Sequence, residues 1–391
     1  MTRVRLGEIC ERLSSGKSIK AAEVQESGTY PVIGGNGLRG YAERYNFDGE
    51  CAVIGRQGAA CGNVRFHSGK AYMTEHAVVA VANESNDSHY LAYLLSTMSL
   101  GRLSTQSAQP GLSVKTLSKQ EIDLPSLEKQ RQVVKVIGSI DDKIGVNAKL
   151  NGYLLELATA RFESALKTKS KTVRFGDIVA LEDSKRIPLN SRDREARKGP
   201  YPYYGATSIM DYVDDFLFDE IRVLLGEDGT VVNSEGTPIL QYVWGKYWVN
   251  NHAHILASSG EYSLEAIYVA LKRTAINQIV TGAVQMKISQ RNLKSLELEM
   301  PSSEELGYLQ DLFAAYRSNQ DENTKLAALR DALLPRLMSG EIDVSKVDLT
   351  QLNSHLAKSL RQLGRHVSPQ KNGATRTPAS CPIPPAFTPQ R

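Results

Sequence analysis

The chain has 391 residues, of which 41% are hydrophobic and 23% are charged. This length exceeds the size at which one hydrophobic core keeps growing, so we expect two domains with connecting elements. No stretch approaches the roughly 20 apolar residues that a membrane span requires, and no apolar core of a signal peptide follows Met1. These features predict a cytoplasmic protein that does not enter a membrane.

The formal net charge of +4 is distributed unevenly along the chain. Residues 1–170 carry +4, residues 171–345 carry −6 and residues 346–391 carry +6. The overall charge therefore does not predict nucleic-acid binding by itself. The four cysteines have neither the spacing of a metal site nor that of a disulfide framework, so we expect free thiols. They are Cys10, Cys51, Cys61 and Cys381.

An internal repeat is visible, with matches kept in order at offsets of 169 to 176 residues. Such a drift indicates one ancestral unit with small insertions in the second copy. The matching segments are Val4–Ile9 with Val173–Ile178, Val53–Gly58 with Leu224–Gly229, His76 with His252, and Ile122–Pro125 with Leu298–Pro301.

Each copy begins with about 125 residues in which short apolar runs alternate with turn residues. Runs such as Cys51–Ile54 and Ala77–Val81 are typical of short strands, and we predict one helix per copy, at 89–98 and at 264–273. The pattern predicts an α+β protein with two repeated mixed α/β domains.

The second part of each copy has the apolar spacing of a long amphipathic helix. Such a helix is not stable alone in water, so we expect the two to pack as an antiparallel coiled-coil spacer. Gly138, Gly145 and Gly152 recur every seven residues and would either allow close approach of the helices or interrupt the helix. The predicted interface residues are Ile137, Ile140, Ile144, Leu150, Leu154, Leu157, Leu312, Tyr316, Leu326, Leu329 and Leu333.

The usual catalytic and metal-binding motifs are missing. Gly16-Lys17-Ser18 lacks the earlier glycine of a phosphate-binding loop, and no methyltransferase or nuclease signature occurs. His252 and His254 would share one face of a strand without acidic ligands nearby, so we expect structural roles for them and a supporting hydrogen bond for His76. No catalytic residue, metal or cofactor is predicted.

The helical segments and the repeated opening resemble the specificity subunits of type I restriction-modification systems. The first segment carries LEKQRQVV at Leu127–Val134 and IDDKI at Ile140–Ile144, and the second ends in LRDALLPRLMSGEI at Leu329–Ile342. This resemblance implies a chain without catalytic activity that binds double-stranded DNA through two target-recognition domains. It also implies docking of two methylation subunits and, through the complex, of motor and nuclease subunits.

The resemblance and the repeat together predict five segments. Residues 1–126 and 169–301 would form target-recognition domains 1 and 2, and residues 127–168 and 302–343 the two conserved helices. We expect the polar, proline-rich segment 344–391 to be partly disordered.

Candidate DNA contacts are chosen by side-chain chemistry, because Arg and Gln suit guanine and adenine edges and Lys suits phosphates. A charged run is equally typical of a solvated loop. In domain 1 the candidates are Asn36, Arg39, Tyr41, Arg56, Gln57, Asn63, Arg65, Gln106 and Gln109, and in domain 2 they are Lys185, Arg186, Arg192, Arg194, Arg197, Lys198, Tyr204, Gln285 and Lys287.

Two alternatives stay open at this stage. One is a coiled-coil scaffold that does not bind DNA, and the other is a DNA methyltransferase or nuclease with degenerate motifs. The scaffold would not bind duplex DNA even with methylation subunits present, whereas an enzyme would act without partners.

Overall fold

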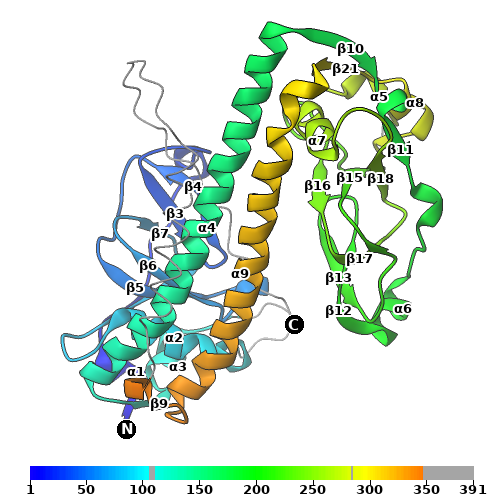
Figure 1. Cartoon of the computed structure of the whole chain (residues 1–391). Coiled ribbons are helices and arrows are strands. Elements are labelled where there is room, and N and C mark those ends of the chain that lie inside the picture. The colour runs from blue at the N-terminus through cyan, green and yellow to red at the C-terminus, as the bar shows by residue number, and fades with distance from the viewer. Residues whose placement is uncertain (105–110, 283–284, 347–391) are drawn as a thin grey trace. The chain divides into compact units, whose positions relative to one another are not determined.

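The computed structural model describes residues 1–104, 111–282 and 285–346. The described residues form two compact units: unit 1 is Met1–Lys149 with the described residues from Gln320 onward, and unit 2 is Leu150–Asn319. The two longest helices, α4 (Leu127–Thr168) and α9 (Tyr308–Met338), each contribute one part to each unit (Figure 1). No helix in the described ranges is long and apolar enough to cross a membrane.

Unit 1 contains a four-stranded sheet in the order β2-β8-β5-β6, a three-stranded sheet β4-β3-β7 and the pair β1-β9. All neighbours are antiparallel except β3 and β7. The strands are β1 (Thr2–Arg5), β2 (Cys10–Ser15), β3 (Tyr30–Gly34), β4 (Gly37–Ala42), β5 (Glu50–Gly55), β6 (Val64–Ser68), β7 (Tyr72–Met73), β8 (Ala77–Ala82) and β9 (Glu121–Leu124), and the shorter helices are α1 (Leu6–Ile9), α2 (Ser88–Thr97) and α3 (Val114–Ser118).

The core of unit 1 lies where α2 and the four-stranded sheet meet the long helices. The Asp87 carboxylate caps α2 by accepting from the Tyr90 amide at 2.8 Å. Side chains of α2 and β8 form one buried cluster with Val133 and Ile137 of α4 and with Leu337 of α9. Because the stripes of both long helices are covered by this core, the helices are stabilised by tertiary packing.

Unit 2 repeats this plan with sheets β11-β18-β15-β16 and β13-β12-β17-β14 and the pairs β10-β21 and β19-β20. Its strands are β10 (Ser170–Arg174), β11 (Val179–Leu181), β12 (Lys198–Tyr204), β13 (Ile209–Val213), β14 (Phe218–Asp219), β15 (Arg222–Gly226), β16 (Leu240–Val243), β17 (Lys246–Val249), β18 (Ala253–Ser258), β19 (Val280–Thr281), β20 (Lys287–Ile288) and β21 (Glu297–Pro301). Its shorter helices are α5 (Phe175–Ile178), α6 (Ser191–Ala196), α7 (Leu264–Arg273) and α8 (Gln290–Lys294).

The repeat predicted from sequence is confirmed by the strand topology. The order β2-β8-β5-β6 in unit 1 corresponds to β11-β18-β15-β16 in unit 2, and the parallel pair β3-β7 corresponds to β12-β17. The helices predicted at 89–98 and 264–273 are α2 and α7. The mixed α/β fold with long helices is therefore as expected. Cys10, Cys51 and Cys61 are free thiols, and Cys381 lies outside the described residues.

Polar bonds join α4 to α9 within unit 1. Asn147 is only 1% exposed, and its amide nitrogen donates to Glu322 at 2.7 Å and to Asn323 at 2.9 Å. Lys143, which is also buried, forms an ion pair with the same Glu322 carboxylate at 3.2 Å. Buried polar groups of this kind fix one register between paired helices, since any other register would leave them without partners.

Asp141 of α4 connects three helices of unit 1. Its carboxylate accepts from the Tyr93 hydroxyl of α2 at 2.6 Å and pairs with Arg330 of α9 at 2.9 Å. Burial and the neighbouring Asp141 raise the pKa of Tyr93 well above its usual value, so this phenol stays a proton donor.

The helices also pack together within unit 2. Asn151 donates to the Tyr316 carbonyl at 3.2 Å and accepts from the Asn319 amide at 2.8 Å. Phe162 of α4 and Phe313 of α9 belong to the same buried cluster. In both units the residue numbers of contacting pairs rise on one helix as they fall on the other, so each pairing is antiparallel.

The residues predicted for the helix interface differ in their exposure. Ile137, Ile140 and Leu154 are buried, whereas Leu157 and Leu329 are 41% and 44% exposed. The buried stripe of α4 includes Asn147, Asn151, Leu154, Ala158 and Phe162, so the stripe passes beside Leu157. The remaining predicted positions are partly buried: Ile144, Leu150, Leu312, Tyr316, Leu326 and Leu333.

The expectation of close helix approach at the three glycines was wrong. A Cβ atom built on Gly145 or Gly152 would have no atom within 4 Å, and one on Gly138 would face His89 and Tyr93 of α2 at 3.8 and 4.0 Å. The helix α4 is nevertheless continuous from Leu127 to Thr168. The glycines therefore neither break the helix nor bring α9 closer.

The buried polar contact at Asn147 gives a stability prediction. Replacing Asn147 with Ala leaves Glu322 and Asn323 without their buried partner, which costs about 1–3 kcal/mol of unfolding free energy. We expect a lower denaturation midpoint in urea, whereas Val146→Ala, at an adjacent residue 37% exposed, should change it little. Equal midpoints for the two variants would contradict a stabilising role for this contact.

Candidate nucleic-acid interface

Three segments of unit 1 that are distant in sequence meet at one polar surface. They are the turn from Gly34 to Gly37 between β3 and β4, the residues that follow β5, and the residues that precede β8. A Cβ built on Gly35 would lie 2.7 Å from the His76 carbonyl oxygen and 3.3 Å from Gly55 Cα. Only glycine at this position lets the backbone of the turn lie so close to His76 and Gly55. The next residue, Asn36, is therefore held near the end of β5 and the start of β8.

Three arginines border this surface. Arg39 packs over Gly34 and Arg65 over Gly37, where the built Cβ atoms would lie 2.7 Å from Arg39 Cδ and 3.4 Å from Arg65 Cζ. Among the described residues the Arg56 guanidinium makes a single hydrogen bond, a long one of 3.4 Å to the Ser15 hydroxyl. Within the described ranges no carboxylate lies at ion-pair distance from any of the three. Their positive charge is therefore available to an anion such as phosphate. We call Asn36, Arg39, Arg56, Gln57, Arg65 and His76 the arginine face.

Gln57 is held in place on the arginine face by a histidine. His76 Nδ1 donates to Gln57 Oε1 at 3.0 Å, and His76 Nε2 lies 3.4 Å from the Glu75 carboxylate. The supporting hydrogen bond expected for His76 is thus present, although its partner is an exposed candidate base contact. A side chain that is fixed before binding loses less conformational entropy when it meets a base.

The other candidates of domain 1 are placed differently. Tyr41 lies at the opposite end of β4, where its backbone pairs with Gln25. Asn63 closes the loop after β5, since its carbonyl accepts from the Gly55 amide at 2.8 Å, and its side chain is exposed. Gln106 and Gln109 lie outside the described residues.

The basic candidates of unit 2 differ from those of unit 1 because internal carboxylates neutralise most of them. The ion pairs are Lys185–Glu182 at 2.7 Å, Arg186–Glu227 at 2.6 Å, Arg194–Asp211 at 3.3 Å, Arg197–Asp214 at 2.9 Å, Lys198–Asp211 at 2.8 Å and Lys287–Glu227 at 3.4 Å. Arg194 and Arg197 also lie over the rings of Tyr203 and Trp248. Most positive charges of this run are therefore already paired within the chain.

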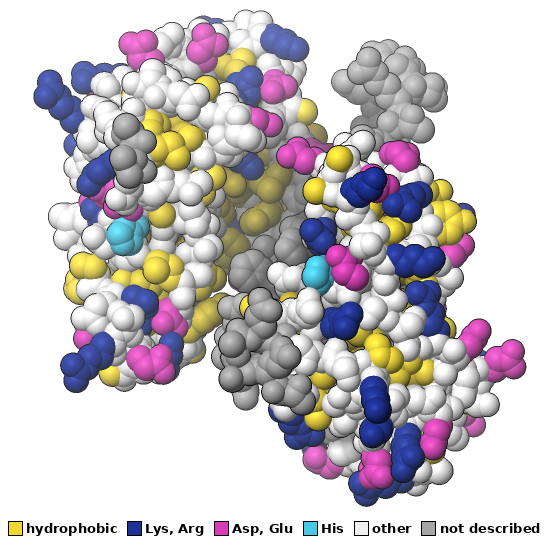
Figure 2. Space-filling view, turned by 180° about the vertical axis from the view of Figure 1, so that it is seen from behind, with side chains coloured by type: hydrophobic (Ala, Val, Ile, Leu, Met, Phe, Trp, Pro, Cys, Tyr) yellow, Lys and Arg dark blue, Asp and Glu magenta, His cyan; other side chains and the backbone are white. Residues whose placement is uncertain are grey.

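Three further candidates of unit 2 complete the set. Arg192 is exposed on α6 and has no ion pair among the described residues, and Gln285 is exposed. Tyr204 packs edge-on against Tyr247, and burial raises the pKa of Tyr204 to about 12. On the face shown in Figure 2, Lys and Arg side chains are interspersed with Asp and Glu in both parts. This mixture of charges agrees with the small formal net charge of the chain, +4.

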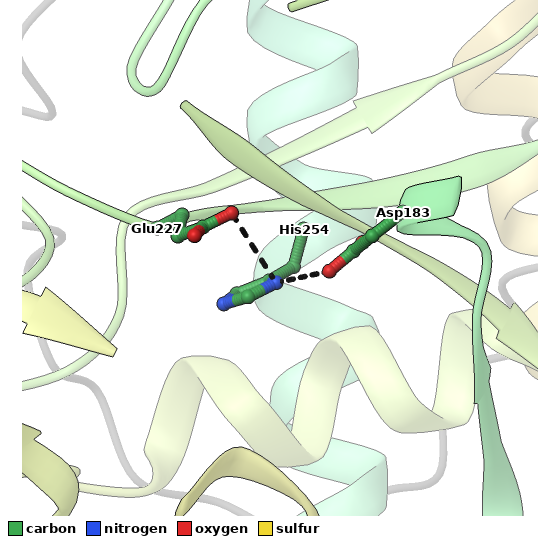
Figure 3. A group of neighbouring side chains, drawn as sticks. All are labelled: Asp183, Glu227 and His254. Carbon is green, nitrogen blue, oxygen red and sulfur yellow. Dashed lines mark hydrogen bonds and ion pairs between the residues drawn. The ribbon is translucent and has the colours of Figure 1, made fainter. Parts of the chain in front are cut away.

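A buried ionic cluster lies beneath the surface of unit 2 (Figure 3). His254 is 1% exposed, and its Nδ1 bonds to Asp183 at 2.6 Å and lies 3.8 Å from the Glu227 carboxylate. His254 Nε2 forms a hydrogen bond of 2.8 Å with the Ile288 carbonyl oxygen. The expectation that no acidic group lies near these histidines was wrong, because Asp183 and Glu227 are distant in sequence from His254. His252 also lies before β18 and not within it.

The cluster resembles a metal site in composition, but its ligands are already engaged. The ligand atoms of Asp183, Glu227 and His254 lie within 4.8 Å of one another. Arg186 donates to Glu227 and to the Ala253 carbonyl, at 2.6 and 2.8 Å, and so provides the compensating positive charge. An ion would have to displace this guanidinium, so we regard the cluster as a structural ion-pair network.

Hydrogen bonding holds Asp183 in its charged form. Burial alone would raise the pKa of Asp183, but the bonds from His254 and from the Ile255 amide, with the charge of Arg186, outweigh burial and lower the pKa. A lowered folded-state pKa stabilises the fold above the pKa of the unfolded chain, and this contribution is lost as pH falls through the folded-state pKa.

The Asp183→Asn substitution tests this cluster. Removing one partner of a buried ion pair costs about 3 kcal/mol. We therefore expect a lower unfolding midpoint at pH 7 and a smaller loss of stability on acidification than in the unmodified chain. The control is Asp177→Asn, at an exposed residue, which should leave both properties nearly unchanged. Identical acid-unfolding curves for Asp183→Asn and the unmodified chain would rule out this contribution.

Comparison with known proteins identifies the family. The type I restriction modification DNA specificity domain matches the chain in two stretches, residues 1–155 and 167–329. These stretches cover most of the chain, and the chain therefore belongs to the family of type I restriction-modification specificity subunits. This confirms the resemblance found in the sequence. The match favours neither a scaffold that does not bind DNA nor a degenerate enzyme.

Individual relatives agree with this assignment. The EcoprrI specificity subunit of Escherichia coli is 39% identical over 143 residues, which are 36% of this chain and 35% of that protein. The MjaIX specificity subunit of Methanocaldococcus jannaschii is 24% identical over 402 aligned residues. The alignment covers 85% of this chain and 92% of that protein. The chain thus spans about a third of the Escherichia coli relative but most of the archaeal one.

A solved structure shows the same fold. The S subunit of a type I restriction-modification system from M. genitalium superposes with a TM-score of 0.56 at 17% identity. The superposition covers 86% of this chain and 95% of that chain. The similarity therefore extends over both copies of the repeat.

Proposed function

We propose that this chain is the DNA-reading subunit of a type I restriction-modification complex and that each copy of the repeat reads one half of a two-part target. The observation that supports this most strongly is the arginine face, where arginines without an ion pair in the described part of the chain lie on the same surface as a fixed glutamine. Arginines without carboxylate partners suit phosphates and guanine edges, and glutamine suits adenine. The helical segments would set the length of the gap between the two half-sites.

The chemistry would reside in partner subunits. We propose that this chain, acting in the cytoplasm without a cofactor of its own, docks two methylation subunits and, through them, motor and nuclease subunits. Tyr153 and Leu157 of α4 are 64% and 41% exposed, lie one helical turn apart and offer apolar area for such a partner. We propose that the domain limits lie at residues 126, 168, 301 and 343, as expected from sequence.

The arginine face predicts the salt dependence of DNA binding. Replacing Arg39, Arg56 and Arg65 singly with Ala should weaken binding of the assembled complex to its target. A lost phosphate contact lowers the slope of log K against log salt by about 1, whereas a lost base contact costs about 1–3 kcal/mol and relaxes one base position. Titration of labelled duplex at several salt concentrations separates the two effects.

A matched control is Arg44→Ala, because Arg44 is exposed but already paired with Glu23 at 2.7 Å. We expect its affinity and salt slope to match those of the unmodified complex. If the three arginine-face variants bind as tightly as this control at every salt concentration, the arginine face does not contact DNA.

A further inference from the structure

The two copies place one pair of residues at the same structural position. After β5 the Arg56 amide donates to the His76 carbonyl at 3.0 Å, and after β15 the Glu227 amide donates to the His252 carbonyl at 2.8 Å. The following residues, Gln57 and Asp228, form isolated bridges with Gly111 and Lys287. These backbone contacts are thus the same in both copies, and Gln57 corresponds to Asp228 as His76 does to His252.

The side chains at these positions also make the same contact. Gln57 Oε1 accepts from His76 Nδ1 at 3.0 Å, and Asp228 Oδ1 accepts from His252 Nδ1 at 2.7 Å. No other side-chain hydrogen bond within the described ranges engages Gln57 or Asp228. Each side chain is therefore held at one atom, while Gln57 Nε2 and Asp228 Oδ2 stay available to a ligand.

The free groups differ in hydrogen-bonding character. Gln57 offers an N–H donor together with the second lone pair of its oxygen, which matches the acceptor and donor on the major-groove edge of adenine. Asp228 offers only an acceptor, which matches the amino group of cytosine. A carboxylate facing the acceptor atoms of guanine would be repelled, so Asp228 also discriminates against that base.

The residues around Gln57 are basic, whereas the corresponding residues around Asp228 are not. The side chain that packs on Gly34 is Arg39, and the one that packs on the corresponding Gly205 is Met210, which is 51% exposed. Arg65 pairs with Val53 across β5 and β6, and Gln241 pairs with Leu224 across β15 and β16. With Glu227 in place of Arg56, all three arginines of the arginine face have uncharged or acidic counterparts in unit 2.

We infer that Gln57 and Asp228 are the corresponding base-reading residues of the two half-sites, and that Gln57 selects adenine and Asp228 selects cytosine. This inference rests on the proposed function. The histidines act as positioning residues that hold one atom of each reading side chain. The first copy also provides phosphate affinity, whereas the second contributes discrimination with little electrostatic attraction.

The test is a pair of conservative variants, Gln57→Glu and Asp228→Asn, each produced with the methylation subunits in cells whose adenine methylation is then mapped across the genome. The Asp228→Asn variant keeps a side-chain oxygen for His252 and gains an N–H donor, so one base of the second half-site should change from cytosine to adenine. Gln57→Glu should change one base of the first half-site. The untouched half-site and the gap should stay the same.

The control is Asp219→Asn, at an exposed residue of β14 with no side-chain bond in the described ranges, which should leave the whole motif unchanged. If a variant complex methylates too little to map, its binding is compared on duplexes that differ at single base pairs. We then expect preference for the original base to fall about 5- to 150-fold.

Two outcomes separate this inference from the proposed function. If the unmodified complex methylates a two-part motif and both variants keep that motif with undiminished base preference, the assignment of Gln57 and Asp228 is wrong and the proposed function stands. If the unmodified complex methylates no two-part motif, the proposed function itself fails.

Discussion

The constraint on which the structure depends is the burial of one stripe along each long helix. A 42-residue helix with a single apolar face is not stable alone in water. In each unit part of α4 is covered by part of α9 and by the core of one repeat copy. The polar bonds of Asn147 and Asn151 make this pairing specific, because they are satisfied in one register only. The arginine face and the corresponding surface of unit 2 belong to units that this packing stabilises.

On the proposed function, the duplication lets one backbone serve two different half-sites. The bonds that hold the residues after β5 and β15 in place, from Arg56 to His76 and from Glu227 to His252, join backbone atoms and so do not depend on side-chain identity. The side chains beside those bonds can therefore differ between the copies without breaking the bonds. In unit 2 the change from arginine to glutamate at residue 227 is accommodated by Arg186 and the buried Asp183–His254 pair.

Sequence patterns predicted the parts of the structure that rest on periodicity and repetition. The stripe of α4, the helices α2 and α7 and the order of the repeats all follow from local spacing. Leu157 was predicted to lie in the buried stripe because its spacing from Leu154 is three residues. The buried position is the neighbouring Ala158, whose small side chain is only weakly hydrophobic. The glycines of α4 were misinterpreted because sequence does not show which face a small residue occupies.

The candidate site was predicted only in part, for a different reason. Arg39, Arg56, Gln57 and Arg65 were chosen from their chemistry, and the fold does place them on one surface. The same reasoning could not show that the basic residues of unit 2, unlike those of unit 1, have carboxylate partners. Those partners, such as Asp211 for Arg194 and Glu227 for Arg186, are not adjacent to them in sequence. The correspondence between Gln57 and Asp228 could have been noticed from the repeat offset, since both follow the same glycine by two residues.

The central claim is that this chain alone decides which DNA sequence its complex modifies. The most direct measurement maps adenine methylation across the genome of cells that contain the methylation subunits with and without this chain. The account predicts one two-part motif, with a gap of constant length, that is methylated only when the chain is present. Identical methylation maps in the two strains, or a motif with a single undivided part, would contradict it.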